Sequence, residues 1–136
     1  MINKEQLVAQ AIVARKQTYS PYSKFGVGAA LLMKDGTVIH GANIENASFG
    51  LSNCGERSAL FSAYSQGYRK EDIVAMAITG QTEGPISPCG ACRQVMNELL
   101  PKDAPVYLSN LKGDIKETNI KELLPYSFDE IEDNDE

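Results

Sequence analysis

Three cysteines and one glutamate are the residues of this chain whose types and spacing favour chemistry. Cys89 and Cys92 form a C-x-x-C pair in the stretch SPCGACRQV, and Glu56 follows Cys54 by two residues in SNCGERSAL. Each stretch is expected to begin a helix, where exposed N–H groups and the positive end of the helix dipole favour thiolates over thiols. Residues i and i+3 of a helix share a face, so the sulfurs of Cys89 and Cys92 can reach one point. Three thiolates make a good ligand set for Zn²⁺.

The number of protein ligands separates a structural from a catalytic zinc site. A structural site normally has four protein ligands, whereas three ligands and an open position are typical of a catalytic site that holds water. His40 is the only histidine of the chain and lies at the end of an expected strand, where it is a poor fourth ligand. The sequence therefore predicts a catalytic site in which Glu56 stands beside the water, without being a ligand, and takes and returns protons.

Charge gives Arg57 two interpretations. Three thiolates and Zn²⁺ sum to −1, which makes a bound water less acidic than a site with neutral ligands does. Arg57 lies one residue after Glu56 and either donates to the sulfurs, which offsets part of this charge, or is a solvated helix residue. The sequence leaves both interpretations open.

Other uses of the cysteines are less consistent with the sequence. A C-x-x-C pair alone also occurs in redox motifs, and a cysteine nucleophile needs a histidine partner. Neither interpretation uses Cys54 together with Glu56. The pattern as a whole therefore favours a metal site.

Length and composition indicate one ordinary domain. The chain has 136 residues, of which 43% are hydrophobic and 23% charged, and we expect residues 1–128 to form a single catalytic domain. No stretch approaches the ~20 apolar residues of a membrane span, and the N-terminal segment lacks the apolar run of a secretory signal. We therefore expect a cytoplasmic protein.

The negative charge of the chain is concentrated at its end. Residues 129–136, DEIEDNDE, form an acidic C-terminal tail with six carboxylates, so the net charge of −5 becomes −5 + 6 = +1 without them. The body is close to neutral and contains no basic block. This pattern argues against a nucleic-acid partner.

Hydrophobic periodicity and turn residues predict alternating helices and strands. We expect a helix over 4–19, a hairpin over 27–46 that turns at Asp35-Gly36, a helix to about residue 66 capped by Ser52 or Asn53, a strand over 72–80, a helix within 86–101 with Ser87 as its cap and Pro88 in its first turn, strands over 104–110 and 113–120, and a short helical turn over 120–125. Strands that alternate with helices, opened here by an antiparallel hairpin, imply a layered α/β fold.

Several separated motifs resemble one family. The stretches NCGER and SPCGACRQV are similar to the C/H-x-E and P-C-x-x-C signature of zinc nucleobase and nucleoside deaminases. Together with YSKFGVGAALL, GANIENASFGLSNCGERSAL and KELLP, they resemble the small homotetrameric cytidine deaminases over residues 5 to 128. The resemblance implies a three-layer α/β/α sandwich with a mixed sheet, one Zn²⁺ per chain, and a homotetramer whose active sites are shared between subunits.

The resemblance also implies the reaction. Cytidine and 2′-deoxycytidine would be hydrolysed to uridine and 2′-deoxyuridine with release of ammonia, as a step of pyrimidine salvage. Cys54, Cys89 and Cys92 would hold the metal, a zinc-bound hydroxide would attack C4 of the base, and Glu56 would shuttle the protons.

The same resemblance assigns residues that bind the nucleoside. Asn43 and Glu45 match residues that hydrogen-bond the ribose. Phe25 matches an aromatic side chain beside the nucleoside, and Phe128 matches one that stacks on the base from a neighbouring subunit. Without the resemblance, Asn43 and Glu45 would be ordinary turn residues and Phe25 a core residue.

Two positions depart from the usual pattern of that family. Gly55, whose backbone would contact the base, stands where Ala is usual, and Phe49 stands where Tyr is common. Ala47 and Phe49 fall in a segment that the family uses across the subunit interface. The missing hydroxyl of Phe49 predicts a weaker contact to the sugar, without an effect on the chemistry.

Two other functions remain open at this point. One is a deaminase of another aminopyrimidine, such as blasticidin S, which shares the three-cysteine ligand set. The other is a structural-zinc interaction module without activity, which requires a fourth protein ligand. Turnover of cytidine separates the first from the prediction, and the behaviour of a Glu56→Gln variant separates the second.

Overall fold

The computed structural model describes residues 1–128. The helices and strands are, in chain order, α1 (Lys4–Arg15), β1 (Val27–Met33), β2 (Val38–Ala42), α2 (Gly55–Ser65), β3 (Ile73–Gly80), α3 (Gly90–Leu99), β4 (Val106–Ser109), β5 (Ile115–Thr118) and α4 (Ile120–Leu123). Two short 3-10 turns are η1 (Phe49–Leu51) and η2 (Lys70–Asp72). The predicted acidic tail, residues 129–136, lies outside the described residues.

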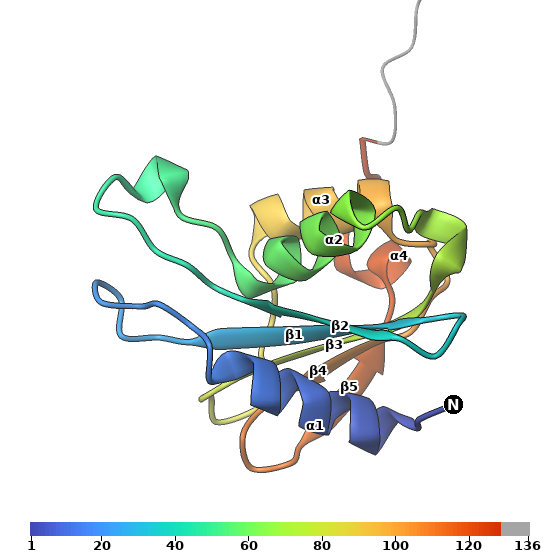
Figure 1. Cartoon of the computed structure of the whole chain (residues 1–136), viewed down its shortest axis with the longest axis horizontal. Coiled ribbons are helices and arrows are strands. Elements are labelled where there is room, and N and C mark those ends of the chain that lie inside the picture. The colour runs from blue at the N-terminus through green and yellow to red at the C-terminus, as the bar shows by residue number, and fades with distance from the viewer. Residues whose placement is uncertain (129–136) are drawn as a thin grey trace, which may run out of the picture.

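The strands form one mixed sheet in the order β2-β1-β3-β4-β5. β1 pairs antiparallel with both β2 and β3, β3 pairs parallel with β4, and β4 pairs antiparallel with β5. The parallel pair requires a crossover, which α3 provides. α1 covers one face of the sheet, and α2, α3 and α4 cover the other (Figure 1). The predicted three-layer α/β/α sandwich with a mixed sheet is confirmed.

Each face of the sheet buries its own apolar cluster. Under α1, the side chains of Leu7, Val8 and Ala11 pack on small residues of β1 and β3. On the other face, a larger cluster lies between the sheet and α2, α3 and α4, with Leu60 and Met96 among its members. Because both faces are covered, β1 and β3 are apolar almost throughout, as strands buried on two sides are.

Two strand glycines let the helices pack close to the sheet. A Cβ atom on Gly28 would lie 2.2 Å from the carbonyl oxygen of Ala11 in α1, and one on Gly41 would lie 2.3 Å from the backbone nitrogen of Ala59 in α2. Neither space admits a larger residue without movement of a helix backbone. The two glycines therefore set the distance of α1 and α2 from the sheet.

The hairpin and the order of elements were predicted correctly. β1 and β2 pair around Asp35 and Gly36, and Gly36 has the positive φ of +89° that such a turn requires. The prediction for the first helix, residues 4–19, was longer than the helix that the structure shows. It ends at Arg15, because the N–H of Tyr19 donates to the carbonyl of Asn43 and the chain there is extended beside Ile44.

The predicted N-caps of two helices were wrong. α2 begins at Gly55 with Cys54 as its N-cap, because Asn53 is held in an extended bridge by two backbone hydrogen bonds of 2.9 Å to Ile44. α3 begins at Gly90 with Cys89 as its N-cap. Ser87 and Pro88 precede α3 instead of starting it, since both are bonded to the guanidinium of an arginine in α3. In both helices the cysteine thus occupies the capping position.

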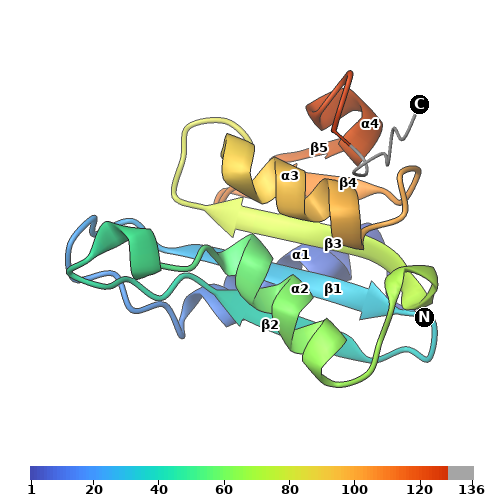
Figure 2. The ribbon, with the colours of Figure 1, turned by 90° about the horizontal axis from the view of Figure 1, so that it is seen from above.

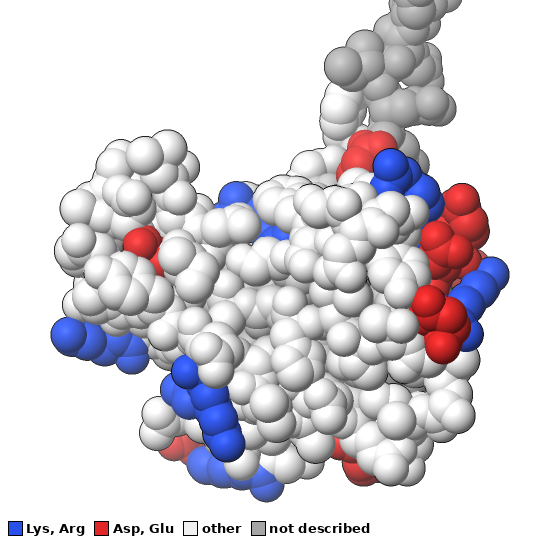
Figure 3. Space-filling model, in the orientation of Figure 1, with Lys and Arg blue, Asp and Glu red and all other residues white. Residues whose placement is uncertain are grey.

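The surface charge agrees with the near-neutral body of the chain. On the face drawn in Figure 3, basic and acidic side chains of the described residues lie scattered around the rim and form no continuous basic track. Within residues 1–128, no helix combines the length and the apolar character that crossing a membrane requires.

Candidate metal and active site

The N-termini of α2 and α3 bring the three cysteines together. The two helices lie next to each other on one face of the sheet (Figure 2), with Cys54 and Cys89 as their N-caps and Cys92 in the first turn of α3. The three Sγ atoms lie within 4.8 Å of one another, and no other histidine, cysteine or carboxylate among residues 1–128 belongs to the group. His40 lies elsewhere, with Nε2 2.7 Å from Oε1 of Gln10.

Hydrogen bonds favour a thiolate at Cys54. Nη2 of Arg57 donates to Sγ of Cys54 over 3.1 Å. A hydrogen bond from the Cys92 thiol, followed by the bond and the charge of Arg57, lowers the pKa of Cys54 to about 5. The pKa of Cys92 is raised because it donates this hydrogen bond and because it is buried. Of the two interpretations of Arg57, the structure supports the donor to sulfur.

Glu56 is a buried carboxyl group beside these sulfurs. Its side chain is 5% exposed, and Oε1 has no hydrogen-bond partner. Burial raises the pKa of Glu56, and the negative charge of Cys54 raises it further. An unpartnered buried carboxyl oxygen is costly unless a ligand or water contacts it. Three soft sulfur donors and this orphaned oxygen fit a zinc ion with an open coordination position.

A cavity of about 440 Å³ opens beside the cysteines and Glu56. Six of its lining residues were candidate site residues in the sequence: Phe25, Asn43, Glu45, Cys54, Glu56 and Cys89. The cavity is large enough to hold a small molecule such as a nucleoside. Positions 25, 43, 45, 54, 56 and 89 of the sequence thus meet at one cavity, although up to 64 residues separate them.

Asn43 is already strongly bonded within the chain. Its Oδ1 accepts from the N–H of Val27 over 2.8 Å, and its Nδ2 donates to Ser20 Oγ and to the carbonyl of Phe25. Both amide hydrogens are therefore used, and a second lone pair of Oδ1 is left for a ligand. Asn43 can accept a hydrogen bond from a hydroxyl group in the cavity.

Glu45 holds the loop that precedes β1. Its Oε1 accepts from the N–H groups of Tyr22 and Ser23 over 3.1 and 3.0 Å, and its Oε2 accepts from Ser23 Oγ. The bond from Ser23 Oγ is the main reason why the pKa of Glu45 is lowered. Glu45 is thus an ionised acceptor whose position depends on Ser23.

The remaining predicted residues lie in different places. Gly55 is buried at the start of α2, and a Cβ atom there would lie 2.6 Å from the carbonyl oxygen of Val27. Ala47 is exposed and does not line the cavity, and the side chain of Phe49 lies outside what the structure describes. Phe128 is 65% exposed and does not line the cavity of its own chain, while its carbonyl accepts from Gln94 Nε2 over 2.8 Å.

Five lining residues were not identified from the sequence as parts of the site: Ser23, Val27, Thr82, Ile86 and Ser87. Ser87 was considered only as a helix cap. The available signal was position, since Thr82, Ile86 and Ser87 lie between the buried strand β3 and Cys89, and loops at strand ends often line sites. Their residue types gave no such signal.

Comparison with known proteins agrees with this site. The family described as the cytidine and deoxycytidylate deaminase zinc-binding region matches residues 1–108. A protein named cytidine deaminase from Halalkalibacterium halodurans is 59% identical over 134 residues, which cover 98% of this chain and all of that protein. The crystal structure of cytidine deaminase from Burkholderia pseudomallei superposes with a TM-score of 0.91 at 52% identity, and covers 93% of this chain and all of that one. That of Mycobacterium tuberculosis has a TM-score of 0.77 at 32% identity, covering 94% of this chain and 98% of that one.

A mixed sheet flanked by helices, with three thiols at two helix N-termini and a buried glutamate, defines a protein with a zinc site of the catalytic kind. The chain belongs to the cytidine and deoxycytidylate deaminase family.

Proposed function

We propose that this chain is a hydrolase that deaminates cytidine and 2′-deoxycytidine, with water, to uridine and 2′-deoxyuridine and ammonia. The observation that carries the proposal is a cluster of three thiols, two of which, Cys54 and Cys89, line one cavity together with Glu56, whose Oε1 has no hydrogen-bond partner. Relatives of more than 50% identity that carry the name cytidine deaminase support the substrate.

Cys54, Cys89 and Cys92 would hold one zinc ion, which when bound supplies a Lewis acid that activates water. Glu56 carries out the proton transfers. Burial and the negative charge of Cys54 raise its pKa, which favours uptake of protons by the carboxylate. Glu56 can take one proton from water and pass it to the ring nitrogen beside C4, and then pass a second proton of the same water to the leaving amine. Arg57 offsets the negative charge of the ligand set through its bond to Cys54.

Asn43 and Glu45 would bind the ribose. Both line the cavity and both keep acceptor capacity, which suits the donor hydroxyl groups of a sugar. A free base has no hydroxyl groups to donate to these acceptors, and sites built to bind a substrate hydroxyl discriminate against ligands that lack it. Phe25 would pack against the nucleoside, and the backbone of Gly55 would contact the base.

The proposal includes a homotetramer with shared sites. Phe128, Leu51 and Tyr126 are large, apolar and exposed, which supports their burial against further copies of the chain. Phe128 would stack on the base in the cavity of a neighbouring subunit, and the segment with Ala47 and Phe49 would cross the interface. We place the reaction in the cytoplasm, where thiols stay reduced, as a step of pyrimidine salvage.

The test is a metal and activity assay on one preparation. Protein purified without chelator is expected to contain about one zinc per chain and to convert cytidine to uridine, followed by the loss of absorbance of the cytosine ring. Free cytosine and blasticidin S serve as comparison substrates, and both are expected to be deaminated much more slowly than cytidine. Zinc without turnover of cytidine would contradict the proposal, and turnover of blasticidin S alone would replace it.

A further inference from the structure

One wall of the cavity is made by a connection without regular secondary structure. Thr82, Ile86 and Ser87 lie in the segment between β3 and α3 and line the cavity. A loop of this kind has no ladder of backbone hydrogen bonds to fix it. Its position must come from contacts with its neighbours.

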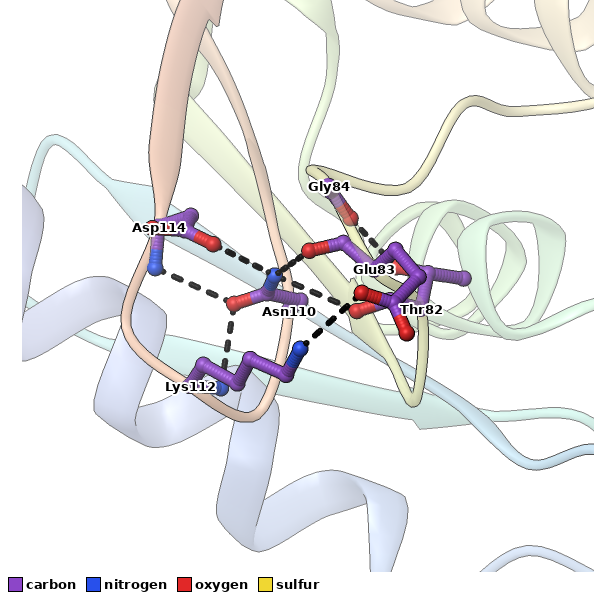
Figure 4. A network of polar contacts seen from close by, with 6 residues as sticks. All are labelled: Thr82, Glu83, Gly84, Asn110, Lys112 and Asp114. Atoms are coloured by element: carbon purple, nitrogen blue, oxygen red, sulfur yellow. Dashed lines mark hydrogen bonds and ion pairs between the residues drawn. The ribbon is translucent and has the colours of Figure 1, made fainter.

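Asn110, at the end of β4, supplies such a contact (Figure 4). It is fully buried at 0% exposure and lines no part of the cavity. Its Nδ2 donates to the carbonyl oxygens of Thr82 and Glu83 over 3.2 and 3.0 Å, and to Oδ2 of Asp114 over 2.8 Å. A single amide thus bonds to two successive carbonyls of the cavity wall.

The other atom of this side chain fixes the turn between β4 and β5. Oδ1 of Asn110 accepts from the N–H groups of Lys112 and Asp114, both over 3.0 Å. The amide is therefore held in one orientation by the turn, and its donors point at Thr82 and Glu83. An oriented amide of this kind is a rigid support rather than a flexible surface contact.

Two other polar contacts join the segment after β3 to the region around the end of β4. The ion pair of Lys112 with Glu83 joins the two segments at 3.3 Å, but its side chains are 62% and 99% exposed, and such pairs contribute little. The N–H of Ile86 donates to the carbonyl of Ser109 over 3.0 Å. Asn110 and its chain neighbour Ser109 thus hold the wall at two points.

The far end of the connection is held independently. Arg93 donates to the carbonyl of Pro88 over 2.8 Å and to Ser87 Oγ over 2.6 Å. Cys89, Cys92 and Glu56 belong to the starts of α3 and α2. A loss of the Asn110 contacts would therefore free Thr82 and Glu83 and leave Ile86 as the main anchor of this wall, while the metal ligands and Glu56 stay in place.

We propose that Asn110 is a positioning residue for substrate binding: it holds the Thr82–Ile86 wall so that the nucleoside meets a preformed cavity. The inference rests on the proposed function for its kinetic consequence. A displaced wall weakens binding of substrate and transition state alike, so KM rises while kcat is retained.

The variant that tests this exchanges two side chains. In Asn110→Asp combined with Asp114→Asn, the carboxylate at 110 still accepts from the turn and the amide at 114 donates to it. The donors to Thr82 and Glu83 are lost, and a carboxylate oxygen then faces their two carbonyl oxygens and repels them. We expect KM for cytidine to rise about tenfold, kcat to stay within about twofold and the zinc content to be unchanged.

Asp114→Asn alone is the matched control, because it keeps every donor of Asn110. It is expected to have the KM of the unmodified protein. Unchanged KM in the double variant would overturn the proposal, and so would a lower melting temperature with kcat and KM both unaltered, which would make Asn110 a structural residue only.

Hydrogen exchange tests the same contact without an assay of activity. In the double variant, the amide of Ile86 is expected to exchange at least about tenfold faster, while those of β1 keep their protection. In the unmodified protein, the amides of Ile86, Lys112 and Asp114 are expected to share one level of protection, which tests the proposal even if the variant does not fold. An Ile86 amide that exchanges as freely as an unbonded loop would overturn it. Absent turnover of cytidine would refute the proposed function alone.

Discussion

The helices that carry the site differ from the other helices at their N-termini. α1 on one face has a polar side-chain cap, and so does α4 on the other face, through Asn119, whereas α2 and α3 do not. On the α1 face, Asn3 and Gln6 form a complete capping box, with Asn3 Oδ1 accepting over 2.8 Å and Gln6 Oε1 accepting over 2.9 Å. On the other face, α2 has no side-chain cap, and the cap of α3 is the sulfur of Cys89, a weak acceptor, at 3.4 Å from the nitrogen of Cys92. A good cap contributes about 0.5–2 kcal/mol, which α1 has and α2 lacks.

This difference separates a structural from a functional helix start. The side chain of a capping residue satisfies one or two of the first four N–H groups, which reduces what the helix start can offer to a ligand. The thiols of Cys54 and Cys89 stand at the N-cap positions of α2 and α3, and the N–H of Cys92 donates to Sγ of Cys89, so the positive ends of the helix dipoles stabilise negative charge on the sulfurs. α2 and α3, which form the site, lack the stabilisation that a polar cap provides, and such a loss of stability is common at functional sites.

The largest test of this comparison substitutes the acid at the same position in both helices. Glu56 is the second residue of α2, and Glu5 is the second residue of α1. Glu56→Gln is expected to lower kcat/KM by at least about 10²- to 10⁴-fold, because it removes the group that transfers protons. The rate of cytidine deamination and the zinc content measure this, and zinc is expected to be retained.

Glu5→Gln is the matched control. Glu5 is exposed, on the opposite face of the sheet from the site, and the variant is expected to keep full activity. A Glu56→Gln protein with full activity and full zinc would remove Glu56 from the mechanism and would favour a structural metal site.

A second test, with an effect of intermediate size, substitutes Gly28 and Gly41, the strand glycines that contact α1 and α2. Gly28→Ala and Gly41→Ala each force a helix away from the sheet, and each is expected to lower the free energy of unfolding by about 1–3 kcal/mol. Only Gly41→Ala is expected also to lower kcat/KM, because α2 carries Cys54 and Glu56. Denaturation in urea and kinetics at a temperature where both variants are folded give the two quantities.

Equal kinetic losses in the two glycine variants would contradict the division between the faces. In that case the position of α1 would matter for the site as much as that of α2 does.

The smallest effect is expected at the end of β1, in the turn of the hairpin. Asp35 accepts from the N–H of Thr37 over 2.9 Å and from the hydroxyl of Tyr68 over 2.8 Å, and these bonds, that of the Thr37 N–H first, lower its pKa below the ordinary value of 3.8. A lowered folded pKa stabilises the fold above the unfolded pKa, and this stabilisation is lost as the pH falls through the folded pKa. Asp35→Asn is therefore expected to be slightly less stable than the unmodified protein at pH 7.

Urea midpoints at pH 7 and at pH below 3.8 measure this difference, which is expected to shrink at the lower pH. The kinetics at pH 7 are expected to be unchanged, because Asp35 lies outside the site. A difference in stability that grows on acidification would show that the hydrogen bonds of Asp35 favour its neutral form.

The amino-acid sequence by itself determined the elements and the reactive residues. Periodic apolar residues place α1, β3 and α3 within a few residues, because such periodicity is local and each face must be buried. The association of Cys54 with Glu56, and of Cys89 with Cys92, can be predicted from the residue types and their spacing, because the members of each pair lie only two or three positions apart. The ends of the elements were less predictable, since Asn53 and Tyr19 are extended by bonds to distant residues.

Only the tertiary structure decided which distant segments meet. Asn43 and Glu45 are ordinary turn residues until their bonds to Val27 and Ser23 become visible. The role of Asn110 depends on the position of the loop after β3, which lies beside the end of β4, where Asn110 follows the strand. In contacts of this kind a side chain bonds to backbone groups, which every residue type has, many positions away in the chain. No residue type or local spacing encodes them, so they follow from the packing of the whole sheet and its helices.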